Sequence, residues 1–179
     1  HLVILGAGHV GRALSSLARF SGFNVTVVDD RSEYANRDNI PDAHDIVVND
    51  FPDVFSRVPV DRGTFIVVAT RGHNHDLEAV KAALGTGAGY IGLMGSRRKK
   101  GLLMNALRDA GFTREDIDRV IIPVGVAINS VTPEEIAVSI MAQIIQRRRQ
   151  HDAPHSGPAA CGRFVHEDGT SEATAPAGR

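Results

Sequence analysis

The chain has 179 residues, of which 42% are hydrophobic and 23% charged, and its formal net charge at pH 7 is −1. This composition is typical of one globular domain, and the balanced charge argues against a protein that holds nucleic acid by electrostatics. A single cysteine, Cys161, excludes an internal disulfide. No apolar run approaches the ~20 residues that span a membrane, and no charged segment followed by an apolar one opens the sequence. We therefore expect a cytoplasmic protein with no membrane span and no secretory leader.

Short β-branched runs alternate with runs in which apolar residues recur at helical spacing. Strands are predicted at Leu2–Leu5, Val25–Val28, Asp45–Val48, Thr64–Ala69, Tyr90–Met94 and Val120–Pro123. Helices are predicted from Val10 up to Gly22, at about His73–Leu84, at about Arg97–Ala110 and from Thr132-Pro133 onward. The strands are mostly continuous apolar runs, which is typical of strands covered by helices on both faces.

This alternation predicts an α/β fold with a doubly wound, mostly parallel, six-stranded sheet in the Rossmann-like order 3-2-1-4-5-6. We assign residues 1–151 to this domain. Residues 152–179 are rich in Gly, Pro and Ala and are predicted to form a flexible tail. The last helix has a second apolar stripe of Val138, Ala142 and Ile145. We expect it to contact a partner, either a second subunit in a homodimer or a domain that this chain lacks; the alternative is a deeply buried helix.

A glycine-rich loop, Gly6-Ala7-Gly8-His9-Val10-Gly11, joins the first strand to the first helix. Asp29 lies 18 residues after Gly11, at the end of the next strand. A G-x-G-x-x-G in this context is the fingerprint of dinucleotide binding, because free amides at the helix start favour an anion. The alternative is a Rossmann-shaped domain without a nucleotide.

The acidic residues after the second strand suggest which dinucleotide binds. Asp29 or Asp30 is placed to accept hydrogen bonds from ribose hydroxyls, which favours NAD over NADP. Arg31 follows directly and leaves a 2′-phosphate possible. His9, at the helix start, is placed either to contact a ligand or to face solvent.

A second candidate segment is Gly95-Ser96-Arg97-Arg98-Lys99-Lys100, after the fifth strand. If Ser96 caps the helix, four cations occupy its first turn, where the helix dipole disfavours positive charge. An anionic ligand explains the cluster, and the alternative is a solvated run of charges.

A third segment, Thr70-Arg71-Gly72-His73-Asn74-His75-Asp76, follows the fourth strand at the same sheet edge. We expect Arg71 and His73 to face the crevice and Asp76 to lie in the first helical turn, with a plain polar helix cap as the alternative. The histidines do not complete a metal-binding pattern, and no metal is expected. The predicted cofactor-binding residues are therefore Gly6, Gly8, His9, Val10, Gly11, Asp29, Asp30, Arg31, Thr70, Arg71, His73, Gly95, Ser96, Arg97 and Arg98.

At these residues the sequence resembles a known family, the xanthine dehydrogenase accessory proteins (XdhC/CoxI). The similar segments are Gly6–Gly11, Val27–Arg31, Thr70–His73 with Asp76, Tyr90–Lys99, Pro123–Gly125 and Thr132–Ala137, in family order. The Gly-Ser-Arg-Arg-Lys and Thr-Pro-Glu-Glu-Ile-Ala blocks are the specific ones.

The resemblance implies the C-terminal Rossmann domain of an accessory protein. Such proteins bind molybdenum cofactor and assist maturation of molybdenum hydroxylases of the xanthine or carbon monoxide dehydrogenase type. The implied partners are the hydroxylase apo-enzyme and a sulfurase. We expect a non-catalytic cofactor-binding protein. The alternatives are an NAD(P)-dependent oxidoreductase that uses His73 as acid or base, or a nucleotide-sensing regulator.

Overall fold

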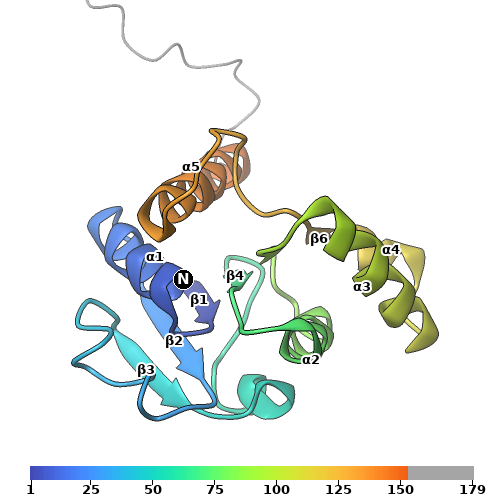
Figure 1. Ribbon diagram of the computed structural model, residues 1–179, viewed down its shortest axis with the longest axis horizontal. Coiled ribbons are helices and arrows are strands. Elements are labelled where there is room, and N and C mark those ends of the chain that lie inside the picture. Colours follow the sequence, from blue (N-terminus) through green and yellow to red (C-terminus); the bar gives the residue numbers. More distant parts are fainter. Residues whose placement is uncertain (153–179) are drawn as a thin grey trace, which may run out of the picture.

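The structure is a computed structural model, and it describes residues 1–152 (Figure 1). Its strands are β1 (Leu2–Leu5), β2 (Val25–Asp29), β3 (Asp45–Val48), β4 (Phe65–Val68), β5 (Tyr90–Leu93) and β6 (Val120–Ile121). Its helices are α1 (His9–Phe20), η1 (Phe51–Ser56, a 3₁₀ helix), α2 (His73–Leu84), α3 (Arg97–Asp109), α4 (Arg114–Asp118) and α5 (Pro133–Asp152). All strand pairs are parallel and the order is β3-β2-β1-β4-β5-β6, which confirms the predicted fold.

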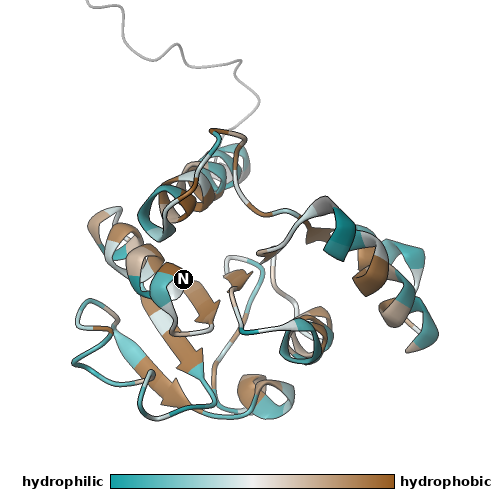
Figure 2. Ribbon diagram, viewed as in Figure 1, coloured by the Kyte–Doolittle hydropathy of each residue, from teal (hydrophilic) through white to brown (hydrophobic). Residues whose placement is uncertain are grey.

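Helices cover both faces of the sheet, and alternate strand residues supply the two cores. In β1, Val3 and Leu5 belong to the core under η1, α2, α3 and α4. Leu2 and Ile4 belong to the core under α1 and α5. Figure 2 shows the strands dominated by hydrophobic residues. Because both faces of the central strands are buried, their continuous apolar runs follow directly from the architecture.

The helix α5 packs along α1 over one face of the sheet (Figure 1). Its buried stripe includes Ala137, Ile140 and Ile144, each 0% exposed. On the predicted second stripe, Val138 is 48% exposed and borders a groove of about 470 Å³ between α1 and α5. The homodimer through this stripe stays a prediction.

The predicted elements agree with the observed ones to within one or two residues. The strand β6 ends at Ile121 rather than Pro123, because a proline has no amide hydrogen to donate to the sheet. Two short helices, η1 and α4, were not predicted from the pattern, since segments of five or six residues have too few turns to show a period. The predicted tail begins at Asp152, which is the last residue of α5, and the rest of it, with Cys161, lies outside the described residues. Within residues 1–152 no helix has the length and apolar character needed to cross a membrane.

Candidate functional site

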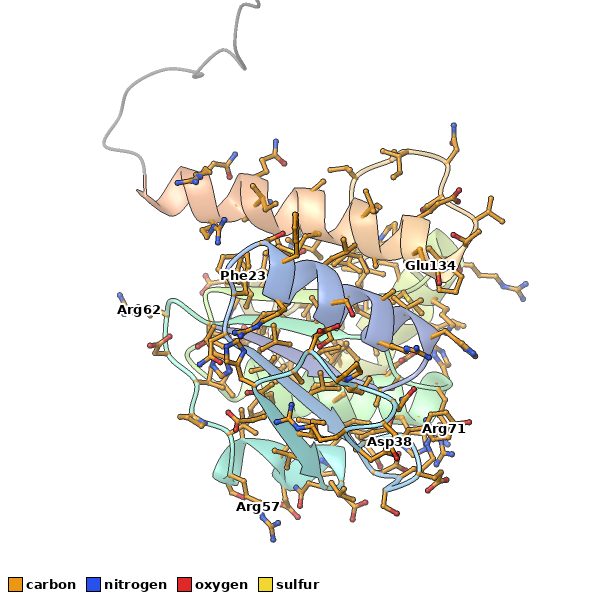
Figure 3. The ribbon with its side chains drawn as sticks, turned by 90° about the vertical axis from the view of Figure 1, so that its left-hand side faces the viewer. Phe23, Asp38, Arg57, Arg62, Arg71 and Glu134 are labelled. Atoms are coloured by element: carbon orange, nitrogen blue, oxygen red, sulfur yellow. The ribbon has the colours of Figure 1, made fainter. Side chains whose placement is uncertain are left out.

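The carboxyl ends of the parallel strands place four predicted segments at one edge of the sheet. The loops after β1, β2, β4 and β5 all leave the sheet there, and β1 and β4 are neighbours although their helices cover opposite faces. Ligands of doubly wound folds bind in the crevice at this switch point. Figure 3 shows Arg71 and Glu134 toward this edge, and Phe23 and Arg62 toward the opposite one.

The glycine-rich loop is held by hydrogen bonds from its own backbone to two neighbouring segments. The Gly6 amide donates to the Val28 carbonyl at 2.7 Å, and the Ala7 amide donates to Asp29 Oδ2 at 2.8 Å. The Asn39 side-chain amide donates to the Ala7 carbonyl at 2.8 Å. These bonds hold the loop in place without a ligand. The start of α1 has no side-chain cap.

Two of the three glycines in the loop are required by the fold. Gly6 has φ +119°, and a Cβ built on it would lie 2.3 Å from the Ala69 carbonyl oxygen. A Cβ on Gly11 would lie 1.9 Å from the Gly6 carbonyl oxygen, so α1 approaches the loop closely only because Gly11 has no side chain. Contacts within the folded chain therefore explain why Gly6 and Gly11 have to be glycines.

No contact within the folded chain requires Gly8 to be a glycine. Its φ is −72° and its ψ −171°, an extended conformation that any residue adopts. Nothing lies within 4 Å of the position that a Cβ would occupy. The space beside Gly8, at the uncapped start of α1, is open to a group from outside the chain.

Asp29 is buried and supports the glycine-rich loop. Its side chain is 2% exposed, and it accepts hydrogen bonds from the Arg31 guanidinium at 2.9 and 3.2 Å as well as from Ala7. The guanidinium also stacks on Tyr34, with its central carbon 3.7 Å from the ring centroid. Burial acts to raise the pKa of Asp29, but the hydrogen bonds from Arg31 and Ala7 outweigh it and hold the pKa below its ordinary value.

Asp30 and Arg71 form an ion pair between two separate loops of the site. Arg71 Nη2 lies 2.9 Å from Asp30 Oδ2, and Arg31 Nε lies 3.6 Å from Asp30 Oδ1. The Arg71 side chain is 52% exposed, whereas that of Asp30 is 16% exposed. The structure thus brings together the predicted residues after β2 and those after β4.

A buried carboxylate, Asp76, connects the segment after β4 to the basic segment after β5. Asp76 is 2% exposed and accepts a hydrogen bond from the Thr70 hydroxyl at 2.6 Å. Lys99 Nζ donates to its other oxygen at 3.3 Å. One of the four cations predicted to need an external anion therefore has a partner within the protein. Asp76 lies in the first turn of α2, as expected.

The remaining predicted residues lie at the same edge. Ser96 caps α3, as predicted, by accepting a hydrogen bond from the Lys99 amide at 3.3 Å. The backbone of Arg97 begins α3, and Arg98 is exposed. His9 and His73 are exposed as the first residues of α1 and α2, and Val10, in the first turn of α1, is partly buried.

Three residues of this edge were not among the predicted site residues: Asn39, Asp76 and Lys99. Lys99 belongs to the basic segment, and Asp76 is an acid in the first turn of another helix. These opposite charges at two helix starts are the signal from which their pairing could have been predicted. The part played by Asn39 has no signal in the sequence, because it depends on how residues 31–40 fold back toward the loop.

His75, in the histidine segment, contacts an aromatic side chain and an acidic one. His75 packs edge-on against Phe51, with ring centroids 5.8 Å apart, and lies 3.9 Å from Glu78. Among residues 1–152 there is no cluster of three or more His, Cys, Asp or Glu side chains that would hold a metal ion.

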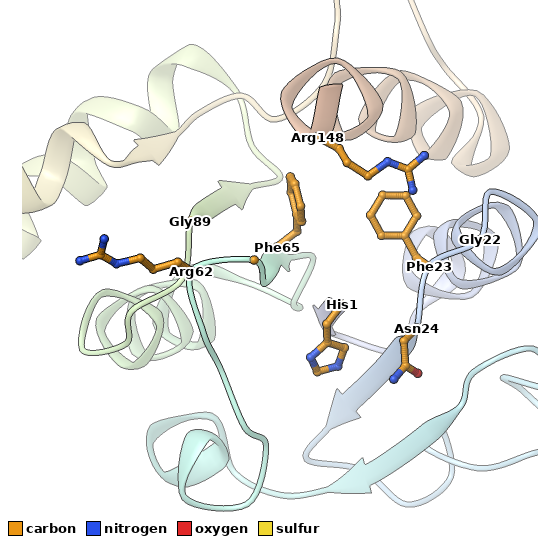
Figure 4. A pocket seen from close by; sticks show the side chains of 9 residues that line it. His1, Gly22, Phe23, Asn24, Arg62, Phe65, Gly89 and Arg148 are labelled. Carbon is orange, nitrogen blue, oxygen red and sulfur yellow. The ribbon is translucent and has the colours of Figure 1, made fainter. Parts of the chain in front are cut away.

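A cavity of about 540 Å³ lies at the opposite edge, where the strands begin (Figure 4). Phe23 and Phe65 line it, with their rings edge-to-face at 6.0 Å, and Arg148 of α5 stacks on Phe23 at 4.3 Å. None of the predicted cofactor-binding residues lines this cavity. It belongs to the edge away from the glycine-rich loop.

The sheet order and the glycine-rich loop at its switch point define the class of this protein as a Rossmann domain. The model of the XdhC Rossmann domain family matches residues 2–144, and the chain belongs to this family. The accessory-protein resemblance stated from the motifs is thereby confirmed at the level of the family.

Individual relatives agree with this assignment. The chain is 36% identical over 154 residues to a probable xanthine dehydrogenase subunit of Bacillus subtilis, a match that covers 83% of the chain and 43% of that protein. It is 35% identical over 146 residues to "Uncharacterized protein YqeB" of Escherichia coli, covering 81% and 27%. The "Molybdenum cofactor insertion chaperone PaoD" of E. coli is 26% identical over 89 residues, covering 50% and 28%.

A crystal structure of a xanthine dehydrogenase from Bacillus halodurans superposes with a TM-score of 0.73 at 32% identity. The match covers 88% of this chain and 44% of the other. The chain thus spans less than half the length of each of these proteins.

Proposed function

We propose that this domain binds a phosphate-bearing cofactor at the carboxyl edge of its sheet, as part of an accessory protein that helps to load molybdenum cofactor into a molybdenum hydroxylase. The ligand's phosphate lies beside Gly8 and receives hydrogen bonds from the first amides of α1. Both molybdenum cofactor and a dinucleotide carry a phosphate that fits this site. The domain binds and protects the cofactor, and it does not turn over a substrate of its own.

The observation that carries this proposal is the open space at Gly8. Gly6 and Gly11 are glycines because the fold leaves no room for a side chain, but Gly8 has room and an ordinary backbone conformation. A ligand that approaches the backbone at this position supplies the missing reason. The uncapped amides beside it provide donors for an anion.

The names of the relatives support the molybdenum part of the proposal. One is a molybdenum cofactor insertion chaperone, and another is a probable xanthine dehydrogenase subunit. We infer that the partners are a molybdenum hydroxylase apo-enzyme and a sulfurase, and that a homodimer forms through Val138 and its neighbours on α5. NAD and NADP are the alternative ligands of the same crevice.

The test is a comparison of Gly8→Ala with Gly87→Ala. Nothing lies within 4 Å of the Cβ position at Gly87 either, but this residue precedes β5 at the opposite edge. Affinities for molybdenum cofactor, NAD, NADP and ADP are measured by calorimetry for both variants and the wild type. We expect Gly8→Ala to weaken binding by about tenfold or more, because a methyl group holds the phosphate away from the amides.

Gly87→Ala is expected to bind as the wild type does. Both variants are expected to unfold within about 1 kcal/mol of the wild type, the scale of a helix-cap substitution. Unchanged affinity in Gly8→Ala, or no binding of any of the four ligands to the wild type, would contradict the proposal. Which ligand binds best decides between molybdenum cofactor and a dinucleotide.

A further inference from the structure

The ion pair between Arg71 and Asp30 passes over the end of the strand that carries the glycine-rich loop. Asp30 follows β2 and Arg71 follows β4, while β1 lies between these two strands in the sheet. The strands on either side of β1 are about 10 Å apart, because neighbours are spaced by about 4.8 Å. The 2.9 Å contact therefore bridges the exit of β1 toward Gly6 and Gly8.

A ligand that extends along this edge of the sheet from the β2 side to the β4 side has to cross this bridge. The bridge is readily opened, because the Arg71 side chain is 52% exposed and exposed ion pairs contribute little to stability. Asp30 is the less exposed partner and keeps Arg31 at 3.6 Å when Arg71 leaves. Arg71 is thus the mobile member of the pair.

Resting on the proposed function, we infer that Arg71 exchanges Asp30 for the ligand, and that the exchange selects a nucleotide over a bare phosphate. In the exchange the Arg71 guanidinium takes a phosphate oxygen, and the released Asp30 carboxylate accepts hydrogen bonds from ribose hydroxyls. A nucleoside diphosphate satisfies both separated groups. Inorganic pyrophosphate satisfies Arg71 only and leaves Asp30 without the partner it had.

The burial of Asp29 assigns the ribose contact to Asp30. Asp29 is 2% exposed and its oxygens are occupied by Ala7 and Arg31. Opening Asp29 to a ribose would break its bonds to Arg31 and free the loop amide of Ala7. Releasing Asp30 breaks only one half-exposed pair, which requires less free energy.

The experiment measures affinities for pyrophosphate and for ADP in the wild type, Asp30→Asn, Arg71→Gln and the double variant. Asp30→Asn frees Arg71 beforehand, and we expect it to bind pyrophosphate about two- to fivefold more tightly, the range of an exposed pair. The preference for ADP over pyrophosphate is expected to fall by a similar factor, because the ribose loses its carboxylate partner. Arg71→Gln is expected to weaken both ligands.

The double variant separates exchange from a general charge effect. If Arg71 is the group released, the gain from Asp30→Asn disappears in the Arg71→Gln background. Asp109→Asn, which removes the same charge from the exposed far end of α3, is the matched control and is expected to change neither affinity. Thermal unfolding of each variant verifies that it folds.

Two outcomes overturn the inference while leaving the proposed function intact. One is wild-type binding of both ligands with no gain in Asp30→Asn, and the other is a gain of the same size without Arg71. Failure of the wild type to bind ADP and pyrophosphate would overturn this inference, and it would overturn the proposed function only if molybdenum cofactor, NAD and NADP also failed to bind.

Discussion

The two edges of the sheet differ in what they offer a ligand. The edge where the strands begin contains a cavity of about 540 Å³ with an aromatic wall of Phe23 and Phe65. The edge where the strands end contains uncapped amides at the start of α1, an open position at Gly8 and two ion pairs. One ion pair joins the loops after β2 and β4, and the other joins the first turns of α2 and α3. None of the predicted site residues lines the aromatic cavity, whereas His9 lines the groove of about 470 Å³ between α1 and α5. The charged and hydrogen-bonding groups, rather than the cavity, locate the candidate site.

The largest expected effect comes from Gly11→Ala, three residues from the open position at Gly8. An added Cβ would lie 1.9 Å from the Gly6 carbonyl oxygen, so the loop and α1 must separate. We expect the free energy of unfolding to fall by about 3 kcal/mol, the scale of an overpacked core, although alanine usually stabilises a helix. Chemical denaturation measures it. A stability equal to that of Gly8→Ala would remove the distinction between the two glycines.

The next effect concerns Asp29, which holds the glycine-rich loop. Asp29→Asn is expected to lower the free energy of unfolding at pH 7 by about 1–3 kcal/mol, because a neutral amide replaces the buried carboxylate that accepts hydrogen bonds from Arg31. The pKa of Asp29 is below its ordinary value of 3.8 in the folded chain, so its contribution is present above that pH and is lost as the pH falls through the folded pKa.

The pH dependence gives an independent check on the same variant. Denaturation midpoints measured from about pH 6 down to about pH 2 are expected to fall less steeply in Asp29→Asn than in the wild type. Parallel curves for the two proteins would mean that protonation of Asp29 does not contribute to the loss of stability at low pH. Asp53→Asn, an exposed acid in η1, serves as the control for the loss of one carboxylate.

The smallest effect is expected at the opposite edge. Arg148→Gln removes a guanidinium that stacks on Phe23, 4.3 Å from the ring centroid. We expect a loss of less than about 1 kcal/mol in stability and no change in ADP affinity. A large loss of ADP affinity in this variant would move the binding site to the aromatic cavity and reverse the comparison.

The sequence predicted the sheet order and every strand, because continuous apolar runs and helical spacing report burial on both faces. It also predicted the glycine-rich loop and the cap at Ser96, since both depend on residues close together in the chain. It did not predict that Asp29 is buried under Arg31. Nor did it predict the pairs Arg71–Asp30 and Lys99–Asp76, whose members are 41 and 23 residues apart. Such pairs depend on how the segments that follow different strands meet at one edge.

The most direct test of a ligand site at Gly8 is a titration of the ¹⁵N-labelled protein with ADP, followed through its backbone amide resonances. We expect the amides of Gly8 and His9, at the start of α1, to shift most, while those of Gly63 and Gly89 beside the aromatic cavity stay in place. The largest shifts at Gly63 and Gly89, or no shift at Gly8, would contradict a binding site at the carboxyl edge.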